Sequence, residues 1–487
     1  MPTAPPLTLA SGLTRDFLLH HRICPRAMGD DGMLVVAMAD DALRSGVDDL
    51  ALAYRLRVRL ETVAQSDVER LIERLATRSE RTIELARPDD GAEDLATDVR
   101  DLANQPPVIR YVNLLVRDAY DAGASDIHLE AARSGLAARF RVDGVLTPAP
   151  EPPSHLHHAI VSRIKLLAEL DIAERRRPQD GRIRVRLEAR ELDLRVSTVP
   201  TMFGESVVLR LLDHGGRPVT LEELGMSVSV LEQVSVLSRR PHGIVLVTGP
   251  TGSGKTTTLY AALQRRNASA EKVITVEDPI EYQLPGITQM PVHGQAGVTF
   301  GSALRAILRQ DPDVVMIGEM RDRETAEIAV QAAMTGHLVF STLHTNDAIS
   351  AVPRLIDLGI PEYLLAATLE GVLAQRLVRR VCEMCRESYR PSPDVIGFVS
   401  GGDPVCEVTH GAGCRDCRGT GYRGRIGLFE LLTANDACRD AIARRASRAE
   451  LRALAQSGGF VPLRAAGWTK VVAGLTTVEE VARVIQS

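Results

Sequence analysis

The sequence predicts a multidomain α/β protein whose largest domain is built on a mostly parallel β-sheet. Residues from about 216 to 375 alternate short apolar runs with helical patterns, which is typical of such a sheet. A glycine-rich segment follows one of these runs, at residues 249–256. A chain of 487 residues also has room for about three or four domains.

The composition argues against several classes of protein. Lys and Arg number 58 and Asp and Glu 63, which gives a net charge of −5, whereas a nucleic-acid-binding surface is basic. Aromatic residues make up only 3%, which disfavours binding of single strands by stacking. No apolar run is long enough to span a membrane, and residues 1–6 do not resemble a secretory signal. We therefore expect a cytoplasmic protein that reaches a membrane only through partners.

Residues 1–85 read as a small N-terminal α/β domain. Residues 33–38 predict a strand. Residues 68–75 predict an amphipathic helix, because their apolar side chains recur with helical spacing. Residues 86–105 are rich in Asp and Glu, which indicates a solvated linker.

Residues 106–215 predict a second, smaller α/β domain. A helix is expected over 108–122, followed by strands over 125–129, 137–142 and 182–187. Arg139 and Arg141 alternate with Phe140, so both should project from one face of their strand. A solvated basic strand face is the alternative to a functional role for these arginines.

A phosphate-binding loop is the most specific motif in the chain. The predicted strand 244–247 leads into a segment that matches the GxxxxGK[ST] pattern at every fixed position and precedes a predicted helix. Lys255 can reach the β- and γ-phosphates of a nucleotide, and the Thr256 hydroxyl can ligate Mg²⁺. The segment consists of Gly249, Pro250, Thr251, Gly252, Ser253, Gly254, Lys255 and Thr256.

Two further predicted strands end in acidic residues. Glu319 follows the apolar run 314–317, at the end of the strand where α/β proteins bind ligands, and is expected to orient the attacking water or hold the metal. Gly318 stands where most P-loop proteins have Asp. Glu277 ends the strand 273–277 and is a second catalytic candidate. For Asp278 and Glu281, helix capping and function remain equally open.

Two histidines flank the predicted strand 338–343. His337 opens the strand and His344 follows it. In a nucleotide-binding domain such histidines could contact the γ-phosphate, although a structural role remains equally open.

Four of the seven cysteines form two CxxC pairs. Paired CxxC arms in a cytosolic protein indicate a tetrahedral zinc site, and four thiolate ligands leave no position for water, so this zinc would be structural. A redox role is the less favoured alternative. The ligands would be Cys382, Cys385, Cys414 and Cys417, within a tetracysteine element at 376–430 that precedes a helical region at 431–487.

Taken together, these motifs resemble the ATPases of type II secretion and type IV pilus assembly. Their P-loop, Asp box, atypical Walker B segment and His box correspond here to residues 249–256, 275–281, 304–322 and 336–346. The resemblance covers roughly residues 106–487. It implies a RecA-like P-loop ATPase domain at 216–375, a PAS-like domain at 106–215 and an N-terminal docking domain. It also implies hexameric rings in which arginines of the PAS-like domain, here Arg139 and Arg141, act on the γ-phosphate.

The resemblance further implies a function and its partners. We expect a motor that uses ATP, Mg²⁺ and Zn²⁺ to drive pseudopilus assembly in type II secretion. It would form a homo-hexamer and dock on the cytoplasmic domain of an inner-membrane secretion-platform protein, without inserting into the membrane. A type IV pilus extension ATPase is the nearest alternative. A nucleic-acid-translocating motor and a nucleotide-binding scaffold without turnover are alternatives of other classes.

Overall fold

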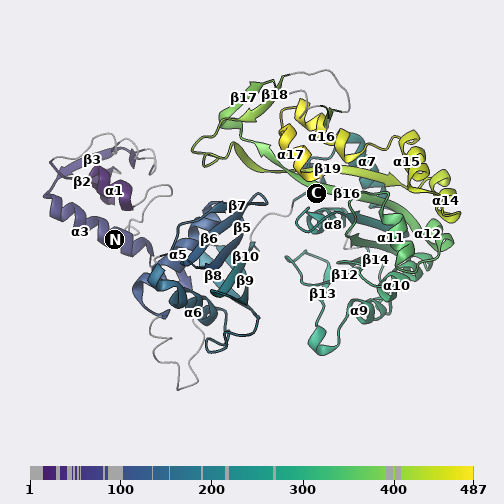
Figure 1. Cartoon of the computed structure of the whole chain (residues 1–487), viewed down its shortest axis with the longest axis horizontal. Helices are drawn as coiled ribbons and strands as arrows, with labels where there is room; N and C mark the ends of the chain where they lie inside the picture. The colour runs from purple at the N-terminus through teal and green to yellow at the C-terminus, as the bar shows by residue number, and fades with distance from the viewer. Residues whose placement is uncertain are drawn as a thin grey trace. The chain divides into compact units, whose positions relative to one another are not determined.

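The computed structural model divides into two compact units, Met1–Gly215 and Gly216–Ser487, which we describe separately (Figure 1). The residues that the structure describes are 15–28, 33–40, 47, 50–51, 54, 56–80, 83–85, 103–133, 135–152, 154–187, 190–213, 219–266, 270–390, 397, 399–400 and 407–485. Most of the predicted acidic linker, residues 86–102, lies outside them.

In the part of the first unit that the structure describes, a three-stranded sheet packs with helices α1 and α3. The predicted strand 33–38 is β2, and the predicted helix 68–75 lies within α3. Leu34 and Val36 are fully buried against Val68 and Ile72 of that helix, so the apolar spacing identified a real core. The elements are α1 (Arg15–His21), β1 (Ile23–Met28), β2 (Leu34–Met38), β3 (Val58–Thr62) and α3 (Gln65–Glu80).

A seven-stranded antiparallel sheet forms the rest of the first unit. Helices α5 (Pro106–Asp121) and α6 (His157–Leu167) contact each other and the sheet, and they share its hydrophobic core. Charged side chains therefore gather on the opposite face. In sheet order the strands are β4 (Ile83–Leu85), β8 (Gln179–Leu187), β9 (Arg190–Thr201), β10 (Gly204–Asp213), β5 (Ala124–Ala132), β6 (Gly135–Val142) and β7 (Val145–Pro148).

The second unit contains a second seven-stranded sheet. All neighbouring strands are parallel except the last pair, which confirms the predicted α/β class. The central strands are buried on both faces, which explains why they read as continuous apolar runs. In sheet order they are β13 (Thr288–Pro291), β12 (Val273–Glu277), β14 (Val314–Ile317), β15 (Leu338–Leu343), β11 (Gly243–Thr248), β16 (Leu369–Val381) and β19 (Tyr422–Thr433).

Helices cover both faces of this sheet. Alternate residues of β11 enter different cores: Val245 and Val247 join α7 (Val228–Leu237) and α8 (Lys255–Leu263), whereas Ile244 and Leu246 join the other layer. That layer contains α9 (Phe300–Leu308), α10 (Arg323–Met334), α11 (Ala351–Asp357), α12 (Glu362–Thr368), α14 (Asp436–Ala443), α15 (Arg448–Ser457), α16 (Leu463–Val472) and α17 (Val478–Ile485).

The tetracysteine element is an excursion between β16 and β19. The expected boundary at 375 lies inside β16, and the one at 430 lies inside β19, so the sheet continues through both positions. Beyond the sheet, β17 (Arg386–Tyr389) and β18 (Val408–Gly411) form a short antiparallel pair (Figure 1). Among the described residues, no helix is both long and apolar enough to cross a membrane.

Candidate active site and metal centre

The P-loop connects β11 to α8 at the carboxyl edge of the parallel sheet. Gly252 and Gly254 adopt φ angles of 78° and 86°, in the left-handed region that favours glycine. Gly249 is also restricted by space, because a Cβ there would lie 2.4 Å from the carbonyl oxygen of Gln375. The backbone can therefore curl around an anion, and the N-terminus of α8 adds its positive dipole end.

Lys255 lies at the start of α8 and folds back over the loop. Its Nζ donates hydrogen bonds to the carbonyl oxygens of Gly249, at 2.8 Å, and Pro250, at 3.0 Å. Burial lowers the pKa of Lys255 to about 8, although the nearby carboxylate of Glu319 opposes this shift. A bound phosphate group would give the buried Lys255 ammonium a negatively charged hydrogen-bond partner.

The polar groups of the loop fit a nucleotide with Mg²⁺. Ser253 is 3% exposed, and its hydroxyl has no hydrogen-bond partner within the part of the chain that the structure describes. Such a buried hydroxyl is costly unless a ligand satisfies it. Thr256 is half-buried one residue beyond Lys255, where its hydroxyl could ligate the metal.

Glu319 and His344 lie at the carboxyl ends of the neighbouring strands β14 and β15. His344 Nε2 is 3.4 Å from Glu319 Oε2, and Arg321 Nη2 is 2.5 Å from Glu319 Oε1. The Glu319 side chain is 13% exposed, whereas that of His344 is 48% exposed. The structure therefore brings two predicted site residues together beside the P-loop lysine.

Glu277 is more deeply buried than its predicted catalytic role requires. It is 2% exposed, and Tyr260 of α8 donates a short hydrogen bond to its Oε2. Its Oε1 accepts hydrogen bonds from Thr275 Oγ1 at 2.5 Å and from Gln289 Nε2 at 3.2 Å. This carboxylate joins the P-loop helix to β12 and β13, and its acceptor positions are occupied by protein donors.

His337 lies at the opposite edge of the sheet from the P-loop. It precedes the first residue of β15, which pairs with Gly243 at the start of β11, whereas the P-loop follows the end of β11. The His337 Nδ1 is 2.9 Å from the carbonyl oxygen of Ala332 and 3.1 Å from Thr335 Oγ1. A six-residue strand spans about 20 Å. His337 is therefore remote from the nucleotide held by the P-loop of the same chain.

Arg139 and Arg141 lie in the first unit, on the face of the antiparallel sheet that carries no helix. Arg139 Nη2 donates to Glu130 Oε1 at 2.5 Å. Arg141 Nε lies 3.8 Å from Asp126 Oδ2, and the same carboxylate binds Arg210 of β10, with Nε 2.9 Å from Oδ1. Strand register adds Arg182 and Arg195 to this face, because Arg195 pairs with both Arg182 and Arg210. The arginine-rich face is thus wider than β6 alone.

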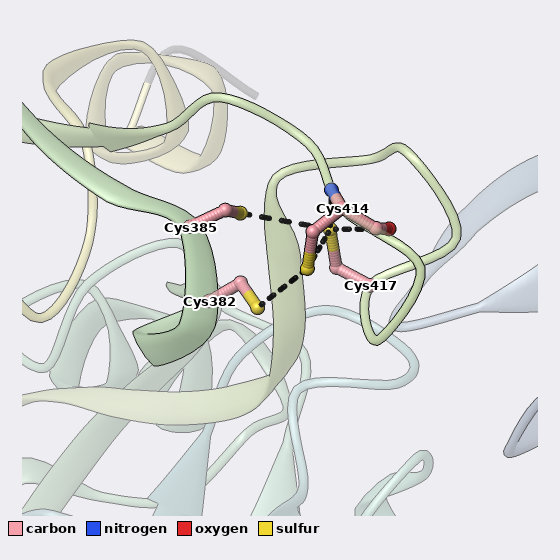
Figure 2. Close-up of side chains that lie close together, drawn as sticks. All are labelled: Cys382, Cys385, Cys414 and Cys417. Carbon is pink, nitrogen blue, oxygen red and sulfur yellow. Dashed lines mark hydrogen bonds between the residues drawn. The ribbon is translucent and has the colours of Figure 1, made fainter. Parts of the chain in front are cut away.

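The four predicted zinc ligands form one cluster (Figure 2). Each offers a sulfur atom within 4.8 Å of the others, and the sulfur–sulfur distances include 3.9 Å for Cys382–Cys414, 3.8 Å for Cys385–Cys417 and 3.7 Å for Cys414–Cys417. Four sulfurs at 2.3 Å around a tetrahedral Zn²⁺ are separated by about 3.8 Å. The cluster therefore has the dimensions of a zinc site.

Backbone amides around the cluster favour its thiolate form. Amide N–H groups of Gly413, Cys414 and Gly421 donate to cysteine sulfurs at 3.1 to 3.3 Å. Burial alone would raise the pKa of Cys417, but hydrogen bonds from the amides of Cys414 and Gly421 and from the thiols of Cys414 and Cys385 together lower it to about 6, whereas burial raises the pKa of Cys385 to about 12. A thiolate is the form that binds zinc.

Comparisons with known proteins show which family the chain belongs to. Residues 101–483 match the family described as type II/IV secretion system protein, and residues 2–82 match the MshEN domain. Type II secretion system protein E of Xanthomonas campestris pv. campestris is 46% identical over 98% of this chain and 85% of its own. The type IV pilus assembly ATPase PilB of Myxococcus xanthus is 42% identical over 92% of this chain and 81% of its own.

A solved structure resembles this chain over most of its length. The crystal structure of the pilus retraction motor PilT with bound ADP aligns with a TM-score of 0.53 and 28% identity, over 76% of this chain and 95% of that one. The family match covers most of the chain, and the P-loop, Glu319 and His344 lie within it. The chain therefore belongs to the type II/IV secretion system protein family, and it is a P-loop ATPase of that family.

Proposed function

We propose that this ATPase is the motor that drives pseudopilus assembly and protein export by type II secretion. One observation carries the proposal: Lys255, Glu319 and His344 meet at the carboxyl edge of one parallel sheet, in a chain 46% identical to a type II secretion protein E. A phosphate-binding loop beside a carboxylate is the arrangement that ATP hydrolysis requires.

Each residue of the site has a distinct part in this reaction. The backbone N–H groups of residues 251–256 and the Lys255 ammonium hold the phosphates, and Thr256 would hold Mg²⁺, which would neutralise phosphate charge. Glu319 accepts a hydrogen bond from the attacking water and orients it toward the γ-phosphate. His344 contacts Glu319 and is exposed enough to reach the same phosphate.

We propose that the working form is a homo-hexamer in which Arg139 and Arg141 complete the active site. Guanidinium groups stabilise the charge that develops on a transferred phosphoryl group. In the described structure Glu130 holds Arg139 and Asp126 holds Arg141. In the assembled ring, phosphate would have to replace these carboxylates as the partner of each arginine. Assembly would bring the arginines and the P-loop together, so we expect it to raise turnover.

The remaining domains have supporting roles in this proposal. Residues 1–85 would dock on the cytoplasmic domain of an inner-membrane secretion-platform protein, which would hold the motor at the membrane from the cytoplasm. Zinc at the four cysteines would fix the excursion between β16 and β19.

Type IV pilus extension is the second candidate, because PilB of Myxococcus xanthus is 42% identical. The six matches described as type II secretion proteins E or HxcR that rank above it are 46% to 52% identical, which favours secretion. Binding of residues 1–85 to the platform protein of one system and not of the other would distinguish the two.

The first experiment is phosphate release by the purified full-length chain, with and without enforced hexamerisation. Wild type should hydrolyse ATP faster when assembled, and Glu319→Gln should abolish turnover while ATP still binds. If the assembled wild type is no faster than Glu319→Gln, the motor proposal fails and a nucleotide-gated scaffold takes its place.

A further inference from the structure

The loop that carries His344 is attached to the C-terminal helices through a buried arginine. We propose that Arg376 of β16 is a positioning residue for ATP hydrolysis, which holds the loop 344–350 so that His344 faces Glu319. This inference rests on the proposed role of His344 and adds a residue that none of the sequence motifs contains.

Arg376 is 4% exposed and its guanidinium bridges two distant segments. Its Nε donates to the carbonyl oxygen of Val484 in α17, at 3.1 Å. Its Nη2 donates to Asn346, reaching the carbonyl oxygen at 3.2 Å and Oδ1 at 3.3 Å. Asn346 is two residues beyond His344, so this contact fixes the loop directly after the histidine.

Other contacts attach the same loop to its surroundings. Thr345 N donates to Thr248 Oγ1, at 2.8 Å, which joins the loop to the residue that precedes the P-loop. Ala348 N donates to the buried Glu430 carboxylate, at 2.8 Å, and that carboxylate also accepts from Leu463 N of α16. The loop is therefore held between the nucleotide-binding edge and the C-terminal helices.

Asp347 makes the third attachment. Its Oδ2 lies 3.0 Å from Arg448 Nη2 and 3.6 Å from Arg452 Nη2, both on α15. These arginines are about half exposed, whereas Arg376 is buried. Water screens the Asp347 pairs, so the buried Arg376 contact should contribute more than they do to the position of the loop.

Arg376 acts through the loop because its side chain points away from the nucleotide-binding helix. The preceding residue, Gln375, accepts a hydrogen bond from Thr258 of α8, at 2.6 Å. Successive side chains of a strand point to opposite faces, which places Arg376 on the other side of the sheet. Arg376 is still close to the site, because Gly249 of the P-loop packs against the carbonyl oxygen of the adjacent Gln375.

The test is a double-mutant cycle in the assembled full-length protein. Arg376→Lys keeps the charge but cannot bond Val484 and Asn346 together, because lysine lacks the planar fork of arginine. The matched control is Arg379→Lys on the same strand, since Arg379 joins β16 to Glu480 of α17 at 2.7 Å and does not contact the loop. Each change is made alone and with His344→Ala, and kcat and KM are measured for ATP.

We expect Arg376→Lys to lower kcat about tenfold with KM changed less than about twofold, and to have almost no further effect in His344→Ala. If the two losses multiply, or if Arg379→Lys has the same effect as Arg376→Lys, the positioning role is wrong. If His344→Ala retains wild-type kcat, it is the proposed function of His344 that fails. Should Arg376→Lys not fold, Asn346→Ala removes the side-chain half of the contact, at Oδ1, and enters the same cycle.

Discussion

His344 and Glu319 face each other across the carboxyl ends of β15 and β14, with 3.4 Å between Nε2 and Oε2. The same carboxylate lies 2.5 Å from Arg321 Nη2 and interacts with the charge of Lys255. Glu319 is therefore bordered by basic side chains on several sides, and these contacts fix the direction in which its carboxylate oxygens point. A fixed carboxylate is what a water-orienting residue requires.

The contact between His344 and Glu319 can be tested by substituting His344. His344→Ala should lower kcat of the assembled enzyme by about 10- to 100-fold, because Glu319 loses a neighbouring side chain that fixes its orientation. ATP affinity should change little, since the P-loop is untouched. Phosphate release and equilibrium nucleotide binding measure the two effects. A variant with weaker binding and unchanged kcat would place His344 in nucleotide recognition instead.

The P-loop lysine predicts proton uptake on nucleotide binding. The pKa of Lys255 is lowered to about 8 by burial, and bound phosphates would raise it again because they stabilise the charged form. At pH 8.5, binding of ATP should therefore take up about 0.7 proton per site, and at pH 7 almost none. Calorimetry in two buffers of different ionisation enthalpy measures this uptake.

Lys255→Arg is the control for that experiment, because arginine stays protonated across this range. Equal uptake in wild type and Lys255→Arg would show that another group titrates. The lowered pKa of Lys255 also makes the free energy of unfolding depend on pH. The free protein binds fewer protons than the unfolded chain between about pH 8 and 10.5, so this lysine makes the nucleotide-free fold relatively more stable as pH rises through that window.

The sequence could predict those parts of the site that lie within one local segment. The P-loop needs only a strand, its glycines and a helix in succession, and the structure contains these three parts in that order. Glu319 and His344 could also be expected together, because each follows a parallel strand and parallel strands end at one edge. His337 lies apart from them for the same physical reason: it precedes its strand, so it lies at the other edge.

Long-range partners could not be predicted in this way. Nothing local to Arg376 indicates that Asn346 and Val484 would meet it, since these residues are 30 and 108 positions away. The burial of Glu277 likewise depends on Tyr260 and Gln289, which come from separate elements. Apolar periodicity identifies which strands are buried, but it does not identify the partner of a buried polar group.

The contacts of Glu277 predict a milder loss than its sequence motif suggests. Glu277→Gln keeps an oxygen that can accept from Tyr260, so turnover should fall by less than about tenfold, against complete loss in Glu319→Gln. Tyr260→Phe should lower the melting temperature, because it removes the short hydrogen bond to the carboxylate. Tyr282→Phe, whose ring centroid lies 4.7 Å from that of Tyr260, is the matched control.

Complete loss of turnover in Glu277→Gln, with ATP binding and melting temperature intact, would contradict a purely structural role in joining the P-loop helix to β12 and β13. It would restore Glu277 as a group that acts on water or metal, as its motif indicates.

The tetracysteine cluster predicts one zinc ion per chain, measurable by mass spectrometry of the purified protein. Cys414→Ser should lose the metal, because three thiolates and a hydroxyl no longer satisfy a structural site. Its melting temperature should fall, since the cysteine segments that precede β17 and follow β18 would no longer be joined by the metal. Cys438→Ser is a control outside the cluster, although it is buried and carries its own packing cost. Full zinc content in Cys414→Ser would rule out this ligand set.

The arginine-rich face of the first unit makes a prediction about mixed rings. If Arg139 completes the site of a neighbouring subunit, Arg139→Ala and Lys255→Ala rings should each be inactive when pure. Random 1:1 co-assembly would then regenerate about a quarter of the sites, because an intact P-loop from one variant meets an intact Arg139 from the other. Arg176→Ala, which removes an arginine 89% exposed elsewhere in the same unit, controls for loss of charge. Mixed rings as inactive as the pure ones would exclude action between subunits. An active pure Arg139→Ala ring would shift the role to Arg141 or to the other arginines of that face. Their guanidinium groups would then suffice to stabilise the transferred phosphoryl group.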